Sequence, residues 1–238
     1  MTGPDNPTLP VGTPVPDWTS AAPITKEPIK GQRCDLKPLS VAHAAQLHAA
    51  FSADPTGTLW TYMPCGPFAN AEDYADWVEG AAQQDVPIFY TIIDKASSAP
   101  VGVASYLRIQ PLQGVVEVGW LTFAPTLQRS TLATEAMFLM MQRAFDLGYR
   151  RYEWKCDALN AASKKAATRL GFTYEGTFRQ AVVYKGRNRD TAWFSIIDSE
   201  WPAIRDAFQA WLDPQNFDQD GQQRQRLSMP SARVFEAR

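Results

Sequence analysis

Hydrophobic positions along this chain switch repeatedly between the spacing typical of strands and that of helices. Short apolar runs bounded by Pro, Gly, Ser or Ala turn clusters predict strands. The predicted strands are residues 33–39, 86–93, 101–109, 115–123, 151–156, 172–178, 181–185 and 190–197. The last two are expected to form a hairpin whose polar tip is Gly186–Arg189. Alternation is clearest at Arg151–Cys156, where apolar and charged side chains fall on opposite faces.

Helical spacing lies between these strands. Predicted helices are residues 40–53, a segment opening at residue 70, and residues 132–147, 160–171 and 199–212. Ser40, Asn70 and Asn160 are suitable N-cap residues because their side-chain oxygens can accept from a free amide of the first turn. Leu132–Leu147 is the clearest helix, with an apolar stripe and Gly148 as a C-terminal stop.

The order of these elements predicts one mixed α/β domain. Helices lead, an antiparallel meander follows, and a β-α-β-α-β unit closes the chain, so we expect a mixed, mostly antiparallel central sheet flanked by helices. Residues 33–213 form this domain. Residues 1–32 are rich in proline and predict an extended arm, held by Val15, Trp18 and Ile24. Residues 214–238 are polar and predict a second surface arm.

Composition narrows the class of protein. The chain has 238 residues, of which 45% are hydrophobic, so wholesale disorder is excluded. A formal net charge of −2 argues against nucleic-acid binding by bulk positive charge. No apolar run is long enough to span a membrane, and the first residues do not resemble a secretory signal. Three well-separated cysteines argue against a disulfide framework and favour the cytoplasm, and the presence of only two histidines argues against a histidine-based zinc site.

The stretch that carries candidate chemistry begins at the strand 115–123. A short linker follows, and the long helix then opens at Gln128–Glu135. A helix start presents unpaired N–H groups and the positive end of its dipole, which suit a pyrophosphate. Arg129 adds a fixed positive charge, and small side chains at Ser130, Thr131 and Ala133 leave room for a ligand. Ordinary strand-to-helix packing gives the same pattern, so this signal is weak alone.

Further motifs follow in a fixed order. They are Asn-x-x-Ser at Asn160–Ser163, Leu-Gly-Phe-x-x-Glu-Gly at Leu170–Gly176, Arg-Gln-Ala at 179–181 and a polar turn at 186–190. With the cradle at Gln128–Ala133 and Ala-Thr-Glu-Ala at 133–136, the chain resembles the GNAT superfamily of acyl-CoA-dependent N-acyltransferases. It looks most like the branch that acetylates the N-termini of ribosomal proteins. The resemblance covers about residues 30–200.

The resemblance implies a fold and a cofactor site. In the family, a bulge splays the strand before the cradle, so that its backbone pairs with the pantetheine arm as a strand would. Backbone amides then hold the pyrophosphate, and Asn160 binds the pantetheine. The implied acetyl-CoA residues are Leu121, Thr122, Phe123, Gln128, Arg129, Ser130, Thr131, Leu132, Ala133, Thr134, Asn160 and Ser163.

The chain departs from the family pattern at three positions. Thr131 replaces the cradle glycine, and its methyl crowds the phosphate or its hydroxyl donates to it. Ala167 stands where many members carry a tyrosine that acts as the general acid. This leaves Ser163 to protonate the departing thiolate. Val182 stands where the ribosomal branch has a proposed glutamate base. Glu175 and Tyr184 remain as substitute catalytic groups.

The resemblance therefore implies an enzyme that moves the acetyl group of acetyl-CoA directly to a primary amine, in a ternary complex and without a metal. The amine belongs to a protein N-terminus or to a small molecule such as an amino acid, an aminoacyl nucleotide or an antibiotic. A module that senses acyl-CoA without turnover is the alternative. Trp60, Tyr62, Met63 and Phe68 face the acceptor or pack in the core. No nucleic acid or membrane partner is expected, and a homodimer is left open.

Overall fold

The computed structural model describes residues 9–230. Its α-helices are α1 (Ala44–Phe51), α2 (Ala71–Gln83), α3 (Thr131–Asp146), α4 (Ala161–Arg169) and α5 (Trp201–Leu212). Short 3-10 helices lie at Val41–His43, Thr58–Trp60 and Pro214–Asn216. The predicted caps are confirmed, since Asn70 accepts from the amide of Asp73 and Asn160 from that of Ser163, while Ser40 caps the first 3-10 turn.

Eight strands form one sheet in the order β1-β2-β3-β4-β5-β6-β8-β7. They are β1 (Ile29–Lys30), β2 (Cys34–Pro38), β3 (Ile88–Asp94), β4 (Pro100–Gln110), β5 (Val115–Phe123), β6 (Arg151–Asp157), β7 (Thr173–Tyr184) and β8 (Arg187–Ile197). All neighbours are antiparallel except β5 and β6. The predicted mixed, mostly antiparallel α/β sheet is confirmed.

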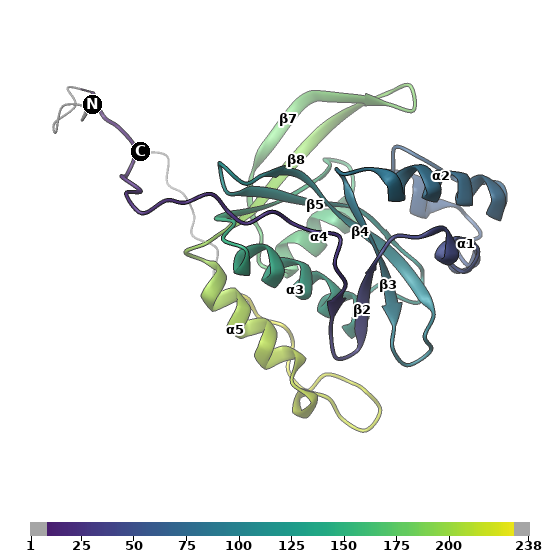
Figure 1. The fold of residues 1–238 in the computed structure, drawn as a ribbon. Helices are drawn as coiled ribbons and strands as arrows, with labels where there is room; N and C mark the ends of the chain where they lie inside the picture. The colour runs from purple at the N-terminus through teal and green to yellow at the C-terminus, as the bar shows by residue number, and fades with distance from the viewer. Residues whose placement is uncertain (1–8, 231–238) are drawn as a thin grey trace.

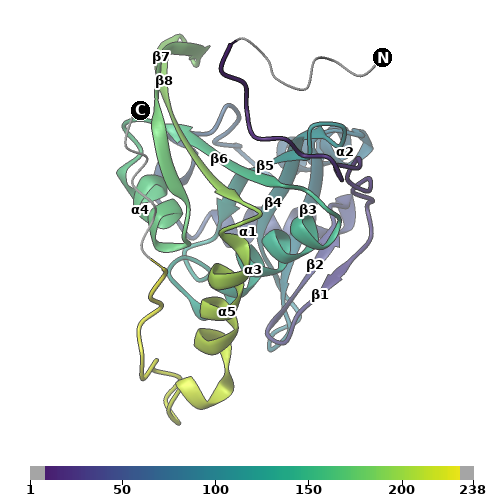
Figure 2. The same ribbon diagram turned by 90° about the vertical axis from the view of Figure 1, so that its left-hand side faces the viewer.

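Helices cover both faces of this sheet and build two cores (Figures 1 and 2). On one face, α3 and α5 pack with the inward residues of β2 to β8 in a core that holds Tyr106, Tyr152 and Phe208. On the other face, α1 and α2 bury an aromatic cluster that holds Phe51, Trp60, Tyr74 and Phe89. Because side chains alternate along each strand, each one belongs to one of these two faces.

The tip of the β7–β8 hairpin differs from the sequence prediction. A polar loop at Gly186–Arg189 was expected, but Tyr184 pairs with Arg187 and only Lys185 and Gly186 form the turn. Both have positive φ, 48° and 69°, which is the geometry of a tight type I′ turn that matches the twist of the strands. The hairpin projects beyond the rest of the sheet and arches over one face (Figure 1).

Both arms contact the domain within the described residues. Ala21 and Ile24 are buried in the larger core, and β1 extends the sheet from within the predicted N-terminal arm. The buried carboxylate of Glu135 accepts from the amides of Gln32, Arg33 and Cys34 and so fixes the entry into β2. In the C-terminal segment, Phe217, Leu227 and Met229 pack partly against the same core. The limits drawn for the arms stay predictions.

Trp18 holds the middle of the N-terminal arm, while Val15 stays half exposed at 49%. The Trp18 indole donates to the carbonyl of Leu112 at 3.1 Å, and the guanidinium of Arg150 lies over its ring at 5.6 Å. The ring lies on Gly114, where an added Cβ would come within 2.3 Å of it. Trp18 is therefore half buried against the body, in line with its predicted role in holding the arm.

We expect Trp18→Ala to lower the free energy of unfolding by about 2 kcal/mol, since it removes a hydrogen bond and a cation–π contact together with buried ring area. Urea denaturation measures the change. Val15→Ala, in the same arm but exposed, is the control and is expected to cost less than about 0.5 kcal/mol. Equal effects of the two substitutions would contradict this anchoring role.

Candidate functional site

The centre of the sheet opens between β5 and β6. Their parallel pairing ends at Val118 and Trp154, although β5 continues to Phe123 and β6 to Asp157. Beyond that point β5 pairs only with β4, and β6 only with β8. A bulge accompanies the separation, because Ser105 and Val103 of β4 face Gly119 and Thr122, and Trp120 in the bulge has φ 54°. The splayed strand pair that the family resemblance implied is therefore present.

A strand edge without a neighbour presents backbone donors and acceptors to any extended ligand. Leu121, Thr122 and Phe123 supply this edge on β5. The carbonyl of Phe123 also accepts from the side-chain amide of Gln128 at 2.9 Å, which ties the following linker back to the strand. Gln128 is thus a brace of the linker in this structure.

The N-terminus of α3 lies directly after this edge. Ser130 caps it, since its hydroxyl accepts from the amide of Ala133 at 3.0 Å and donates to the carbonyl of Leu127 at 2.6 Å. The amides of Ser130 and Thr134 are bonded to Leu127 and Ser130. Within residues 9–230, no acceptor meets the amides of Arg129, Thr131 and Leu132. Those three N–H groups, at the positive end of a 16-residue helix, are the free donors of the cradle that the sequence predicted.

Arg129 and Thr134 of the predicted cradle play different parts. Arg129 has φ 58°, a left-handed conformation, and its side chain is exposed. Thr134 is 3% exposed, and its hydroxyl accepts from Arg169 at 3.1 Å, so it holds α3 to α4. The cradle therefore consists of free amides and one exposed guanidinium.

Asn160 and Ser163 lie at the start of α4, beside the end of β6. The Asn160 side-chain oxygen is used as the cap of Ser163, at 3.0 Å, which leaves its NH₂ group to donate. The Ser163 hydroxyl accepts from the indole N–H of Trp154 at 3.0 Å. Because the indole occupies a lone pair of the oxygen, the hydroxyl proton remains to donate. Ser163 is half buried on the α3 and α4 face of the sheet.

On the opposite face, charged side chains cross from β5 to β6 close to the end of their pairing. Lys155 donates to Glu117 and to Glu153, both at 2.7 Å, and these three side chains are 7%, 8% and 8% exposed. Burial raises the pKa of Glu117 despite the nearby Lys155 and Arg108. Burial also acts on Glu153, but hydrogen bonds from Lys155 and Arg151 outweigh it and lower that pKa. This Glu117–Lys155–Glu153 cluster joins the two strands where they begin to separate.

Asp157 lies on the same face as this cluster, at the splayed end of β6. It is 5% exposed, and its carboxylate accepts from the Tyr184 hydroxyl at 2.9 Å and from the amide of Leu159 at 2.8 Å. Burial, and then the bond to Asp157, raise the pKa of Tyr184 to about 12. Tyr184 thus stays protonated at neutral pH and holds a carboxylate at the mouth of the splay.

The loop between α1 and α2 meets the tip of the β7–β8 hairpin above this pair. Lys185 donates to the carbonyl of Trp60 at 2.9 Å, and the Tyr62 hydroxyl donates to that of Leu159 at 3.2 Å. Tyr62 therefore faces the site. Trp60 is 7% exposed, and Trp60 and Phe68 pack edge-on at 5.3 Å in the smaller core, as the core alternative predicted.

Glu175, the other substitute base, is not brought near Ser163 or Asp157. It forms a two-pronged ion pair with Arg151 at 2.8 and 2.5 Å and accepts from Ser195 at 2.8 Å. The Arg151 bond lowers its pKa. Arg151 begins β6 and Asp157 ends it, so about 20 Å of strand separates the two. The structure gives Glu175 a structural ion pair, and we do not carry it forward as a base.

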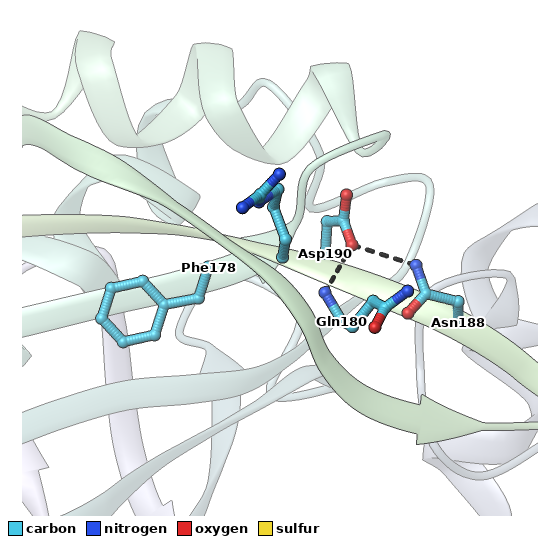
Figure 3. Close-up of a pocket in the computed structure, with 5 residues that line it drawn as sticks. Phe178, Gln180, Asn188 and Asp190 are labelled. Carbon is cyan, nitrogen blue, oxygen red and sulfur yellow. Dashed lines mark hydrogen bonds between the residues drawn. The ribbon is translucent and has the colours of Figure 1, made fainter.

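A hollow of about 750 Å³ lies elsewhere. Phe178, Arg179, Gln180, Asn188 and Asp190 line it on the exposed hairpin. Figure 3 shows Asp190 accepting from the amide of Gln180 and from Asn188, at 2.7 and 3.0 Å. It lies at the bulge of the edge strand β7, where the pairing slips between Phe178 and Val182. It is an open depression beside a bent strand and shares none of the site residues above.

Residues 9–230 hold no group of three side chains suited to a metal ion. Nor does any helix there have the length and apolar character needed to cross a bilayer.

The chain is similar to known proteins in both sequence and structure. Residues 33–173 match the family model of the acetyltransferase (GNAT) domain. A GCN5-related N-acetyltransferase from Brucella melitensis is 45% identical, with a TM-score of 0.87 over 90% of this chain and 97% of that one. A GNAT-family acetyltransferase from Chromobacterium violaceum is 40% identical, with a TM-score of 0.76 over 84% of this chain and 100% of that one.

A more distant structure shares the fold alone. It is the microcin C7 self-immunity acetyltransferase MccE, solved with acetyl-CoA and AMP, at 22% identity and a TM-score of 0.62 over 70% of this chain and 93% of that one. Among curated proteins, none matches this chain.

Proposed function

This chain belongs to the GNAT acetyltransferase family, and from that premise we propose that it transfers the acetyl group of acetyl-CoA to a primary amine in a ternary complex. The observation that carries the proposal is the splay of β5 from β6 with a free-amide helix start directly after it. Together these offer an extended arm a strand edge and its diphosphate an anion cradle.

In this proposal the cofactor lies along β5. The backbone of Leu121, Thr122 and Phe123 pairs with the pantetheine. The free NH₂ group of Asn160 donates a hydrogen bond to the same pantetheine arm. The amides of Arg129, Thr131 and Leu132 hold the pyrophosphate. Acetyl-CoA itself supplies an activated thioester, so this chain has only to position the amine, accept its proton and stabilise an oxyanion.

Proton handling is proposed for three side chains. An amine enters mostly as ammonium, and the Asp157 carboxylate, buried at the mouth of the splay, is the group placed to accept its proton. The Tyr184 hydroxyl holds that carboxylate in place. Ser163 donates toward the departing thiolate from the other side of the sheet, with its oxygen oriented by Trp154. A thiolate leaves readily near neutral pH, since an ordinary thiol has a pKa of about 8.5.

The acceptor is proposed to be the amine of a protein N-terminus or of a small molecule, and to reach the site from the face where Tyr62, Tyr184 and Asp157 meet. Cytoplasmic location and a homodimer stay predictions.

We expect acetyl-CoA to stabilise the folded chain by mass action, by about 2.7 kcal/mol at a hundredfold excess over its dissociation constant. Thermal melting with acetyl-CoA, NAD or ATP measures this, and only acetyl-CoA should raise the midpoint strongly. A thiol-release assay with a panel of amines then tests turnover. If acetyl-CoA stabilises the chain but no amine in the panel leads to release of free CoA, the sensor alternative is favoured. Stabilisation by another nucleotide alone would overturn the proposal.

Substitutions in the cradle test how the phosphates are held. Arg129→Ala removes a charge-assisted contact and should weaken acetyl-CoA binding by about 1.5–3 kcal/mol. Thr131→Gly should change affinity little, because the amide of residue 131 remains. Titration calorimetry measures both. A large loss at Thr131→Gly in a folded protein would show that the hydroxyl itself is a phosphate ligand.

A further inference from the structure

A second cleft, of about 220 Å³, lies on the acceptor face between α2 and the bulge of β5. Its walls are aromatic: Trp77 from α2, Phe89 from β3 and Trp120 from β5. The Trp120 ring is 5.6 Å from Phe89 and 6.1 Å from Trp77. Trp120 is also the residue whose positive φ forms the bulge, so this cleft adjoins the strand edge proposed to hold the cofactor arm.

The polar wall of the cleft is acidic. Asp76 lines it, and α2 also carries Glu72, Asp73 and Glu79 with no lysine or arginine between Ala71 and Gln83. Among residues 9–230, none of these four carboxylates takes part in an ion pair. Aromatic faces beside an uncompensated carboxylate favour a cation, because the ring quadrupole and the negative charge both attract it.

One residue keeps the cleft open. Gly80 lies in the interior of α2, where glycine costs stability relative to alanine. A Cβ built there meets no atom within 4 Å, so packing does not require the glycine. Gly80 itself lines the cleft, so a longer side chain at this position is expected to narrow it.

We propose that this cleft, formed by Asp76, Trp77, Gly80, Phe89 and Trp120, binds a lysine or arginine side chain of the acceptor, and that the acceptor is therefore a basic N-terminal peptide segment. The inference rests on the proposed function and names its substrate class. Along α2, from Glu72 to Glu79, carboxylates recur over about 10 Å, a length suited to several positive side chains rather than to a single small amine.

The same features disfavour a nucleotide acceptor. The Trp77 and Trp120 rings are 6.1 Å apart and tilted by 38°, so a base cannot stack between them. The carboxylates of α2 would repel a phosphate.

The test compares acetylation of two short peptides with the same N-terminal residue, followed by lysine and arginine in one and by glutamine in the other. Thiol release gives kcat/KM for each. The native chain should prefer the basic peptide about tenfold or more. Gly80→Gln fills the cleft, and Asp76→Asn removes its charge; both should bring the preference close to one while the rate with the neutral peptide is retained.

Glu79→Gln is the matched control. It removes a carboxylate from the same helix that does not line the cleft, and it should keep most of the preference. Equal rates with the two peptides in the native chain, a preference unchanged by Gly80→Gln and Asp76→Asn, or turnover of a linear polyamine above both peptides would overturn the inference while leaving acetyl transfer intact. Failure to acetylate any amine would instead count against the proposed function, and with it the substrate class that depends on it.

Discussion

Asp157→Asn is expected to lower kcat at pH 7 by roughly 10²- to 10³-fold while changing the affinity for acetyl-CoA little. The substitution removes the proposed base but keeps an oxygen for the amide of Leu159, so the local turn is preserved. Because a solution amine loses its own proton near pH 8, the need for a base fades as pH rises. The defect should therefore shrink to about tenfold at pH 9.

Steady-state kinetics across this pH range decide the role of Asp157. Asp190→Asn is the control. The Asp190 carboxylate lies on the hairpin, accepts hydrogen bonds from Gln180 and Asn188, and contacts none of the proposed catalytic side chains. Tyr184→Phe should give a smaller loss than Asp157→Asn, because it frees the carboxylate without removing it. A pH-independent defect in Asp157→Asn would contradict proton acceptance by this residue and assign it to packing.

Lys155→Met should lower the free energy of unfolding at pH 7 by about 3–5 kcal/mol. The lysine ammonium neutralises Glu117 and Glu153, which face each other across the parallel strands with side chains only 8% exposed. Methionine keeps the volume of the side chain but removes the buried cation that both carboxylates share. Glu153 then keeps only Arg151, and Glu117 only the half-exposed Arg108 at 3.5 Å, which is the costly way to break a buried ion pair.

The pH dependence of this loss has a definite sign. In the native chain the pKa of Glu153 is depressed, so its stabilising contribution is present above its unfolded pKa and is lost as pH falls through the folded one. In Lys155→Met the pKa of Glu117, which burial already raises, is expected to rise further because its closest cation is gone, so acid relieves the repulsion. Urea denaturation should thus show a smaller difference at pH 5 than at pH 7.

Lys95→Met is the matched control for this prediction. Lys95 is 46% exposed and lies 3.9 Å from Asp35, a surface pair expected to contribute less than about 1 kcal/mol. If Lys155→Met were no more costly than Lys95→Met, the cluster would not join the strands.

The elements of this fold were predictable because their periodicities are local. β5 runs from Val115 to Phe123 as predicted, and α3 begins one residue before the predicted start. The hairpin tip was misplaced because polar composition at Gly186–Arg189 outweighed turn geometry, whereas Lys185 and Gly186 adopt positive φ and close the turn with two residues. The splay was implied by the family motifs alone, since no side-chain pattern marks where two strands stop pairing.

The site was only partly visible in the sequence. The cradle residues follow from a helix start, but which amides are free depends on the Ser130 cap. Asp157 was missed, although it continues the alternation of Glu153 and Lys155 one position beyond the predicted end of the strand. Its importance depends on Tyr184, which lies 27 positions along the chain and reaches it only through the arch of the hairpin. Such long-range contacts leave no trace in local periodicity.

The splay between β5 and β6 also bears on the order of events in a catalytic cycle. The free amides of α3 begin on the face covered by α3, α4 and α5, whereas Asp157, Tyr184 and the aromatic cleft lie on the face of α1 and α2. The two strands stop pairing after Val118 and Trp154, and this is the place where we expect the reactants from the two faces to meet. In the proposed function each reactant therefore has its own entrance, and neither has to arrive or depart before the other. We expect random-order kinetics, in which CoA and the acetylated amine leave in either order.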